Sequence, residues 1–180
     1  MAEITVSFKV NGHFVEVKTE PSQTLLSVLR NELKLKGAKE ACGQGDCGAC
    51  VVLMDGDAVN SCLVLAAQAQ GAELITVEGL AENGVLHSLQ QNFIDNWAFQ
   101  CGYCTSGMLM SAYALLQKNP DPSHDEIRTA ISGNLCRCTG YHEIIEAIEA
   151  SVSELKEPVN QQHLKGEDHE QLGNPTTEIH

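Results

Sequence analysis

The residues with the most distinctive chemistry in this sequence are its eight cysteines, which fall into two groups of four. The first group has the spacing C-x4-C-x2-C-x11-C and consists of Cys42, Cys47, Cys50 and Cys62. The second group has the spacing C-x2-C-x31-C-x-C and consists of Cys101, Cys104, Cys136 and Cys138. Closely spaced thiolates bind soft metals and iron in iron–sulfur clusters, so both groups are candidate metal sites.

The first spacing is that of plant-type ferredoxins, in which four cysteines hold a [2Fe-2S] cluster. Three of the ligands would come from one nine-residue loop, which must curl around the cluster. Gly43, Gly45 and Gly48 lie in this loop and can adopt left-handed or crowded conformations that side chains forbid. They also let backbone N–H groups approach the sulfur atoms, and such hydrogen bonds help to set the reduction potential. The first group therefore predicts a [2Fe-2S] cluster.

The second group leaves more than one interpretation open. A C-x2-C pair with two distant cysteines suits a second [2Fe-2S] cluster, but it also suits a structural zinc site with four thiolates. A thioredoxin-type redox pair at Cys101 and Cys104 is weaker, because no βαβ pattern surrounds these residues. Two clusters would use all eight cysteines, and this count favours a second cluster.

Helix starts are expected next to the second group. Cys104 opens an apolar helical pattern, and Cys138 precedes another that begins around Tyr141. The unpaired N–H groups and positive dipole at a helix N-terminus favour thiolate. Two helix starts would then point at one cluster, and Arg137 would add a positive charge beside it.

The segments around the first group predict a small α+β domain. Residues 4–18 alternate polar and apolar positions around the pair Asn11-Gly12, which is a strong signal for a β-hairpin. Apolar residues then recur at helical spacing from Thr24, and Gly37 ends the pattern. Two further short apolar runs predict strands over 51–54 and 74–77.

The domain around the second group is expected to be helical. Beyond Gly79 the apolar positions follow helical spacing, and Phe93 and Trp97 are expected to belong to its core. The four predicted helical segments include residues 86–97, 108–116, 127–131 and 144–155. A compact bundle of about four helices is therefore expected.

The predicted organisation has two domains and a tail, over residues 1–78, 79–157 and 158–180. The tail is polar and without period, so we expect it to be disordered. Its histidines lack regular metal-ligand spacing; they are His163, His169 and His180.

Composition narrows the class of protein. The formal charge of −13 would repel phosphate groups and argues against nucleic-acid binding. The N-terminus does not read as a signal peptide, and no apolar run is long enough for a membrane helix. Eight cysteines in 180 residues fall below the density of secreted disulfide scaffolds, so a reducing, cytoplasmic environment is expected.

Three strings in the sequence resemble one known family. ACGQGDCGAC at 41–50, QCGYC at 100–104 and GNLCRCTGY at 133–141 are similar to the iron–sulfur subunit of molybdenum hydroxylases. This group contains xanthine dehydrogenase, aldehyde oxidoreductase and aerobic carbon monoxide dehydrogenase. The resemblance covers about residues 3–157. It departs at Ser106, where the family often has proline, and this change should affect local rigidity more than chemistry.

The resemblance implies a β-grasp ferredoxin-like domain followed by a four-helix-bundle [2Fe-2S] domain. It implies assembly with a large molybdopterin-binding subunit and usually with a medium FAD-binding subunit. This chain would be the electron relay, and substrate chemistry would occur in a partner subunit. The second cluster would lie next to the molybdopterin and the first nearer the flavin.

Two residues match positions that contact the pterin in this family, namely Gln100 and Cys138. Without the resemblance, Gln100 would be interpreted as an ordinary helix-end residue. A stand-alone ferredoxin-like carrier is the alternative function. The second cysteine group argues against it, because a free carrier needs only the first cluster.

Overall fold

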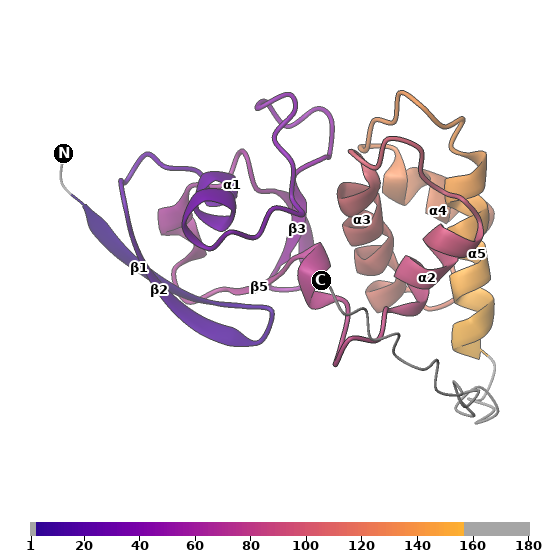
Figure 1. Ribbon diagram of the computed structural model, residues 1–180, viewed down its shortest axis with the longest axis horizontal. Coiled ribbons are helices and arrows are strands. Elements are labelled where there is room, and N and C mark those ends of the chain that lie inside the picture. The colour runs from indigo at the N-terminus through magenta and orange to yellow at the C-terminus, as the bar shows by residue number, and fades with distance from the viewer. Residues whose placement is uncertain (1–2, 157–180) are drawn as a thin grey trace, which may run out of the picture.

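A five-stranded sheet and a group of helices lie side by side in the computed structural model, which describes residues 3–156 (Figure 1). The tail predicted for residues 158–180, with its three histidines, lies outside the described residues. Over the described part of the chain, no helix combines the length and the apolar character needed to cross a membrane.

The sheet has the strand order β2-β1-β5-β3-β4. β1 (Ile4–Val10) pairs antiparallel with β2 (His13–Thr19) and parallel with β5 (Glu73–Ile75). β3 (Val51–Met54) pairs antiparallel with β5 and with β4 (Asp57–Asn60). The predicted hairpin is confirmed: Asn11 and Gly12 form its turn with φ angles of 49° and 80°.

Two elements of the sheet region differ from the prediction. The expected continuous helix is a short α1 (Leu25–Ser27) that runs into a π-helical turn, η1 (Val28–Glu32). Lys34, with a φ of 60°, redirects the chain before Gly37 is reached. The strand expected over 74–77 ends at Ile75, and a 3₁₀ turn, η3 (Val77–Gly79), replaces its last residues. A second 3₁₀ turn, η2 (Ala66–Ala69), precedes β5.

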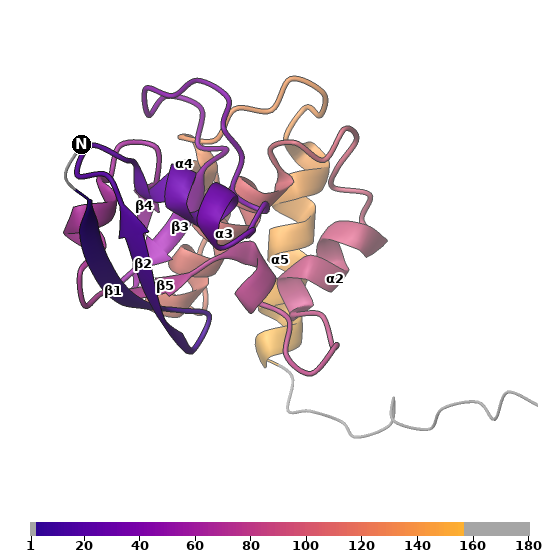
Figure 2. The ribbon, with the colours of Figure 1, turned by 60° about the vertical axis from the view of Figure 1, so that its left-hand side comes forward.

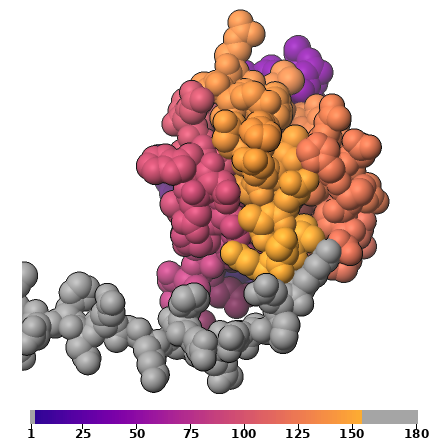
Figure 3. Space-filling model, turned by 90° about the vertical axis from the view of Figure 1, so that its right-hand side faces the viewer, coloured from indigo at the N-terminus to yellow at the C-terminus, as the bar shows by residue number. Residues whose placement is uncertain are grey.

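The helical region contains α2 (Ser88–Asp95), α3 (Thr105–Lys118), α4 (His124–Ile131) and α5 (His142–Lys156). α4 begins with a capping box, in which Ser123 N–H donates to the Glu126 carboxylate at 2.7 Å and Glu126 N–H donates to Ser123 Oγ. α3 packs against the sheet beside β3, and α5 runs between α2 and α4 on the far side (Figures 1 and 3). The start of α3 and the start of α5 thereby come to the same end of the molecule.

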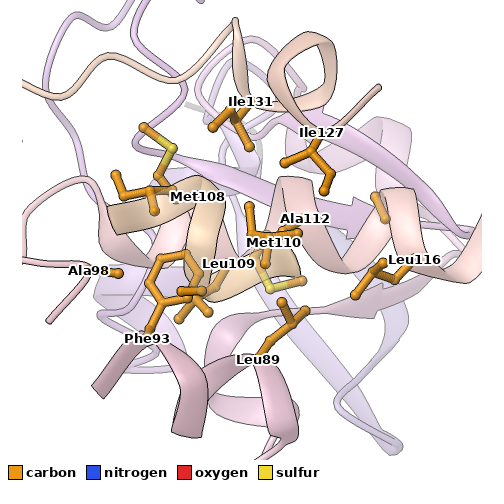
Figure 4. Close-up of a cluster of buried hydrophobic side chains, with 14 of the residues drawn as sticks. Leu89, Phe93, Ala98, Met108, Leu109, Met110, Ala112, Leu116, Ile127 and Ile131 are labelled. Atoms are coloured by element: carbon orange, nitrogen blue, oxygen red, sulfur yellow. The ribbon is translucent and has the colours of Figure 1, made fainter. Parts of the chain in front are cut away.

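β3 is shared by two hydrophobic cores. Val52 is buried in the sheet core together with α1, whereas Val51 and Leu53 point to the other face and pack into the helical core. Successive side chains of a strand face opposite sides, so this short strand contributes to both cores. Figure 4 shows the helical core, in which Phe93 and Met108 lie among side chains of α2, α3 and α4.

Trp97 does not lie in the helical core, contrary to the prediction from the sequence. Phe93 is buried as expected, but the Trp97 side chain is 79% exposed. α2 ends at Asp95, and Trp97 has a φ of 53°, so the helical spacing that assigned Trp97 to the core does not extend to it. The predicted helix was too long by its last two residues.

Candidate metal centres

The first cysteine group lies on a loop that leads into β3. The antiparallel pairing of β3 with β4 returns the chain to this loop, so that Cys62 comes back beside Cys50. Ser61 fixes the return, because its hydroxyl donates to the Cys50 carbonyl oxygen at 2.7 Å. Asn60 donates from its side chain to the Gly45 carbonyl oxygen at 3.1 Å and ties the loop to the end of β4.

The thiols of this group interact in pairs, Cys42 with Cys47 and Cys50 with Cys62. The Gln44 N–H donates to Cys42 Sγ at 3.5 Å and, together with the Cys47 thiol, lowers the pKa of Cys42 to about 6. Burial raises the pKa of Cys50 to about 11. The loop thus favours thiolate at its exposed side and the neutral thiol at its buried side while no metal is bound.

The glycines of the loop have the backbone conformations predicted for them. Gly43, Gly45 and Gly48 have φ angles of 66°, 87° and 68°. These left-handed residues turn the chain tightly enough for Gln44 N–H to reach the preceding cysteine sulfur.

The second cysteine group is assembled from two distant segments, one before α3 and one before α5. Its thiols also interact in pairs, Cys104 with Cys136 and Cys101 with Cys138. Cys104 is the N-cap residue of α3, as the sequence predicted. The loop of the first group, residues 42–50, and the loop that carries Cys136 and Cys138 lie side by side at one end of the molecule (Figures 1 and 2).

Burial and hydroxyl groups give the second group its electrostatics. Burial raises the pKa of Cys104 to about 12. Burial acts on Cys136 in the same direction, but the Thr139 hydroxyl and N–H donate to Cys136 Sγ at 3.0 and 3.4 Å and lower its pKa overall. The pKa of Cys138 is raised, mainly because its thiol is hydrogen-bonded with Cys101.

Tyr141 holds the Cys136 segment in place. Its hydroxyl accepts from the Cys136 N–H at 2.8 Å and donates to the Asn134 carbonyl oxygen at 3.0 Å. Tyr141 itself has a φ of 68° and stands directly before α5. In the sequence, Tyr141 marks a predicted helix start and Thr139 belongs to a motif, but no role was predicted for their hydroxyls. Hydroxyl residues next to a C-x-C pair were a usable signal for such a role.

Of the other residues singled out in the sequence, two are exposed and Ser106 is buried. Gln100, which directly precedes Cys101, is exposed, and so is Arg137. At the start of α3, the Ser106 hydroxyl is buried and has no hydrogen-bond partner within the described residues. Thr105 Oγ1 is also buried and has no hydrogen-bond partner within the described residues. Proline is thus replaced here by a residue with an unused hydroxyl next to the cysteines.

The two groups suit a cluster with two irons. In each group the cysteine thiols interact two by two. Four thiols in two pairs, with N–H and O–H donors aimed at sulfur, form a donor set that fits a [2Fe-2S] cluster.

Comparison with protein families gives two adjoining matches. Residues 8–81 match the 2Fe-2S iron-sulfur cluster binding domain, and residues 76–149 match a second family, the [2Fe-2S] binding domain. The zinc interpretation of the second cysteine group is therefore replaced by an iron–sulfur one.

Similar proteins of established function are subunits of larger enzymes. The nicotinate dehydrogenase small FeS subunit of Eubacterium barkeri is 49% identical over 152 residues, which are 84% of this chain and 97% of that one. The aldehyde oxidoreductase iron-sulfur-binding subunit PaoA of Escherichia coli K12 is 44% identical over 166 residues, covering 84% of this chain and 72% of that one.

Solved structures agree with these matches. Quinoline 2-oxidoreductase from Pseudomonas putida 86 aligns with a TM-score of 0.81 and 46% identity, covering 84% of this chain and 94% of that one. The aldehyde oxidoreductase from Desulfovibrio gigas aligns with the same TM-score and 35% identity, but the match covers only 17% of that chain. The fold therefore occurs both as a separate chain and as part of a longer one.

Proposed function

Because this chain belongs to the family of small iron–sulfur subunits of molybdenum hydroxylase-type oxidoreductases, we propose that it relays electrons from a partner's molybdopterin centre to FAD or another acceptor. The observation that carries this proposal is the arrangement of the eight cysteines. They form two sets of paired thiols at one end of the molecule, and a backbone hydrogen bond from Leu135 N–H to the Cys47 carbonyl oxygen joins the loop of the first set to a loop of the second.

Each set would hold one [2Fe-2S] cluster, which can accept and release one electron when bound. The first would be held by Cys42, Cys47, Cys50 and Cys62, and the second by Cys101, Cys104, Cys136 and Cys138. Gln44 N–H and the Thr139 hydroxyl would hold partial positive charge against the sulfur atoms. Such hydrogen bonds stabilise the extra negative charge of the reduced state.

The partners in this proposal are a large molybdopterin-binding subunit and a medium FAD-binding subunit. The names of similar proteins support the need for partners, since several are called subunits. The exposed thiols of Cys101 and Cys138 support a partner at the second site, with Gln100 and Cys138 contacting the pterin. Trp97 is exposed close by in the chain, and exposed large apolar side chains commonly mark protein interfaces.

The proposal extends to architecture and location. Residues 1–78 would be a β-grasp ferredoxin-like domain and residues 79–157 a four-helix-bundle domain. The eight cysteines are free of disulfides, which supports a reducing, cytoplasmic location.

Purification of the chain together with the products of its neighbouring genes tests the proposal. We expect a stable complex with molybdenum, flavin and about four iron atoms per chain, two for each cluster. Addition of its substrate should then reduce the iron–sulfur absorption. A monomeric carrier that contains iron but never associates with a molybdenum subunit would favour the stand-alone ferredoxin function instead.

A further inference from the structure

A buried asparagine joins the two cysteine loops. The Asn134 side chain is 2% exposed, and its amide donates to the Gly48 carbonyl oxygen at 3.0 Å. Gly48 follows Cys47 in the first loop, whereas Asn134 lies two residues before Cys136 in the second. Next to this bond, Leu135 N–H donates to the Cys47 carbonyl oxygen at 2.9 Å. Neighbouring residues of one loop thus bond to neighbouring residues of the other.

The space around the Gly48 peptide is closed on two sides. A Cβ atom on Gly48 would come within 2.5 Å of Asn134 Nδ2 and 2.6 Å of the Gly133 carbonyl oxygen. A Cβ atom on Gly107, in α3, would overlap the Gly48 carbonyl oxygen. The absence of both side chains lets the first loop lie between the Asn134 amide and the backbone of α3.

The Asn134 backbone is fixed as well. Its carbonyl oxygen accepts from the Tyr141 hydroxyl, which also accepts from the Cys136 N–H. The segment of residues 134–136 is therefore held by Tyr141 on one side and by the first cysteine loop on the other. Little freedom is left for either loop to move relative to its neighbour.

We propose that Asn134 is a positioning residue for electron exchange between the two clusters, an inference that rests on the proposed function. Its hydrogen bond to Gly48 keeps Leu135 N–H against the Cys47 carbonyl. The shortest bonded route between the two cysteine sets then runs from Cys47 across this single hydrogen bond to Leu135 and Cys136. When the cysteines hold their clusters, one electron would pass from the reduced cluster on the second set to the oxidised cluster on the first, with no bond made or broken and no proton moved.

The energetic consequence of losing the amide follows from its burial. Without Asn134 Nδ2, the Gly48 carbonyl oxygen would keep only the Val51 N–H as a donor, at 3.2 Å, and would lose the buried hydrogen bond that joins it to the second loop, so the first loop could shift away from Asn134. A shift of Gly48 would also displace Cys47, the residue directly before it in the chain. The hydrogen bond between Cys47 and Leu135 would lengthen, although all eight cysteines would remain.

The test compares Asn134→Ala and Asn134→Ser with Asn92→Ala in the purified enzyme complex. Asn92 is a matched control, because it is also a buried asparagine, and its side chain donates to the Ser88 carbonyl oxygen and to Glu154, which lie in α2 and α5 outside the segments that carry the cysteines. Iron and sulfide analysis first establishes that both clusters are present. Rapid photoreduction of one cluster then gives the rate of electron redistribution, and paramagnetic resonance of the dithionite-reduced enzyme gives the spin coupling between clusters.

In Asn134→Ala we expect each cluster to keep its own resonance signal while the redistribution rate falls about tenfold, since misplacement by 1 Å can cost up to a hundredfold in geometry-dependent steps. The spin coupling should weaken in parallel. Asn134→Ser retains a short donor and should lie between Asn134→Ala and the unaltered chain. Asn92→Ala should reduce thermal stability and leave both readouts unchanged.

Two results separate the possible failures. Unchanged redistribution and coupling in a fully loaded Asn134→Ala enzyme would overturn the role of Asn134 and leave the relay intact. Absence of electron exchange between the clusters of the unaltered enzyme would overturn the proposed function itself. If Asn134→Ala cannot retain its clusters, the same two readouts on Asn134→Ser decide the question.

Discussion

The two cysteine sites, for which we propose similar chemistry, are constructed differently. The first is local: three of its four cysteines lie in one loop of nine residues, and three left-handed glycines shape that loop. The second is tertiary, because its two halves are separated by 31 residues and meet only when α3 and α5 are brought together by their packing on α2 and α4. Its geometry therefore depends on the helical core, whereas that of the first depends on backbone conformation.

The donors to sulfur differ in the same way. In the first site a backbone N–H, that of Gln44, donates to Cys42. In the second site a side-chain hydroxyl, that of Thr139, donates to Cys136 at the shorter distance of 3.0 Å. A hydroxyl can be removed by mutation and a backbone N–H cannot, so the second site is the more adjustable of the two.

The largest expected effect comes from removing one ligand of each site in turn. Cys47→Ser and Cys136→Ser should each lose about half of the iron, because each site holds its own cluster. In Cys47→Ser, substrate should still reduce the second cluster in a single turnover, while steady-state transfer to the acceptor collapses. Iron analysis and freeze-quenched paramagnetic resonance check this. Normal acceptor reduction without the first cluster would reverse the proposed order of electron flow.

A second prediction separates backbone strain from contact between the loops. Gly43 and Gly48 have nearly equal φ angles, 66° and 68°, but a Cβ atom at Gly43 would meet no atom within 4 Å, whereas one at Gly48 would clash with Asn134. Gly43→Ala should cost about 1 kcal/mol of unfolding free energy from strain alone. Gly48→Ala should cost about 3 kcal/mol or more, since overpacking adds to the strain. Urea unfolding measures both, and equal losses would show that the loops are not tightly packed together.

The sequence predicted what is local. The hairpin around Asn11-Gly12, the glycine conformations of the first loop and the helix start at Cys104 follow from short-range chemistry, and the structure confirms them. β4 was missed although Asp55-Gly56 forms its turn, with φ angles of 52° and 86°. That strand is short and none of its four residues is buried, so it has no apolar pattern.

What could not be predicted depends on tertiary contacts. Nothing near Asn134 in the sequence indicates that its amide bonds to a carbonyl 86 residues away. The zinc alternative stayed open for the second site for the same reason, because spacing across 31 residues does not reveal how thiols pair. Trp97 was placed in the core by periodicity, which fails where a left-handed residue ends a helix.

A third prediction uses thiol reactivity in protein from which the clusters have been removed. Each site contains one cysteine whose pKa is lowered, which is Cys42 in the first site and Cys136 in the second. Each site also contains one cysteine whose pKa is strongly raised by burial, which is Cys50 in the first site and Cys104 in the second. At pH 7, Cys42, with a pKa of about 6, is mostly thiolate, so iodoacetamide should modify it at least about tenfold faster than Cys50. Mass spectrometry at a series of pH values gives the rates. A single common rate at all four positions would mean that the loops lose their conformation with the clusters.

The smallest expected effect comes from an exposed ion pair between α3 and β4. Lys118, at the end of α3, pairs with Asp57 of β4 at 2.5 Å, but both side chains are exposed, so water and salt weaken the pair. The hydrogen bond from Lys118 lowers the pKa of Asp57 in the folded protein from 3.8. A carboxyl group with a lowered pKa stabilises the fold fully at pH values above the pKa of the unfolded chain. This stabilisation is lost as pH falls through the pKa of the folded protein. Lys118→Gln should therefore lower the melting temperature slightly at pH 7 and low salt. The difference from the unaltered chain should shrink as pH falls below 3.8 and vanish below the lowered pKa of Asp57, and it should also vanish in 1 M salt. Its cluster signals and inter-cluster rate should stay unchanged, in contrast to those of Asn134→Ala. A change in electron redistribution in Lys118→Gln would show that the whole interface between sheet and helices, rather than the buried contact at Asn134, sets the distance between the two sites.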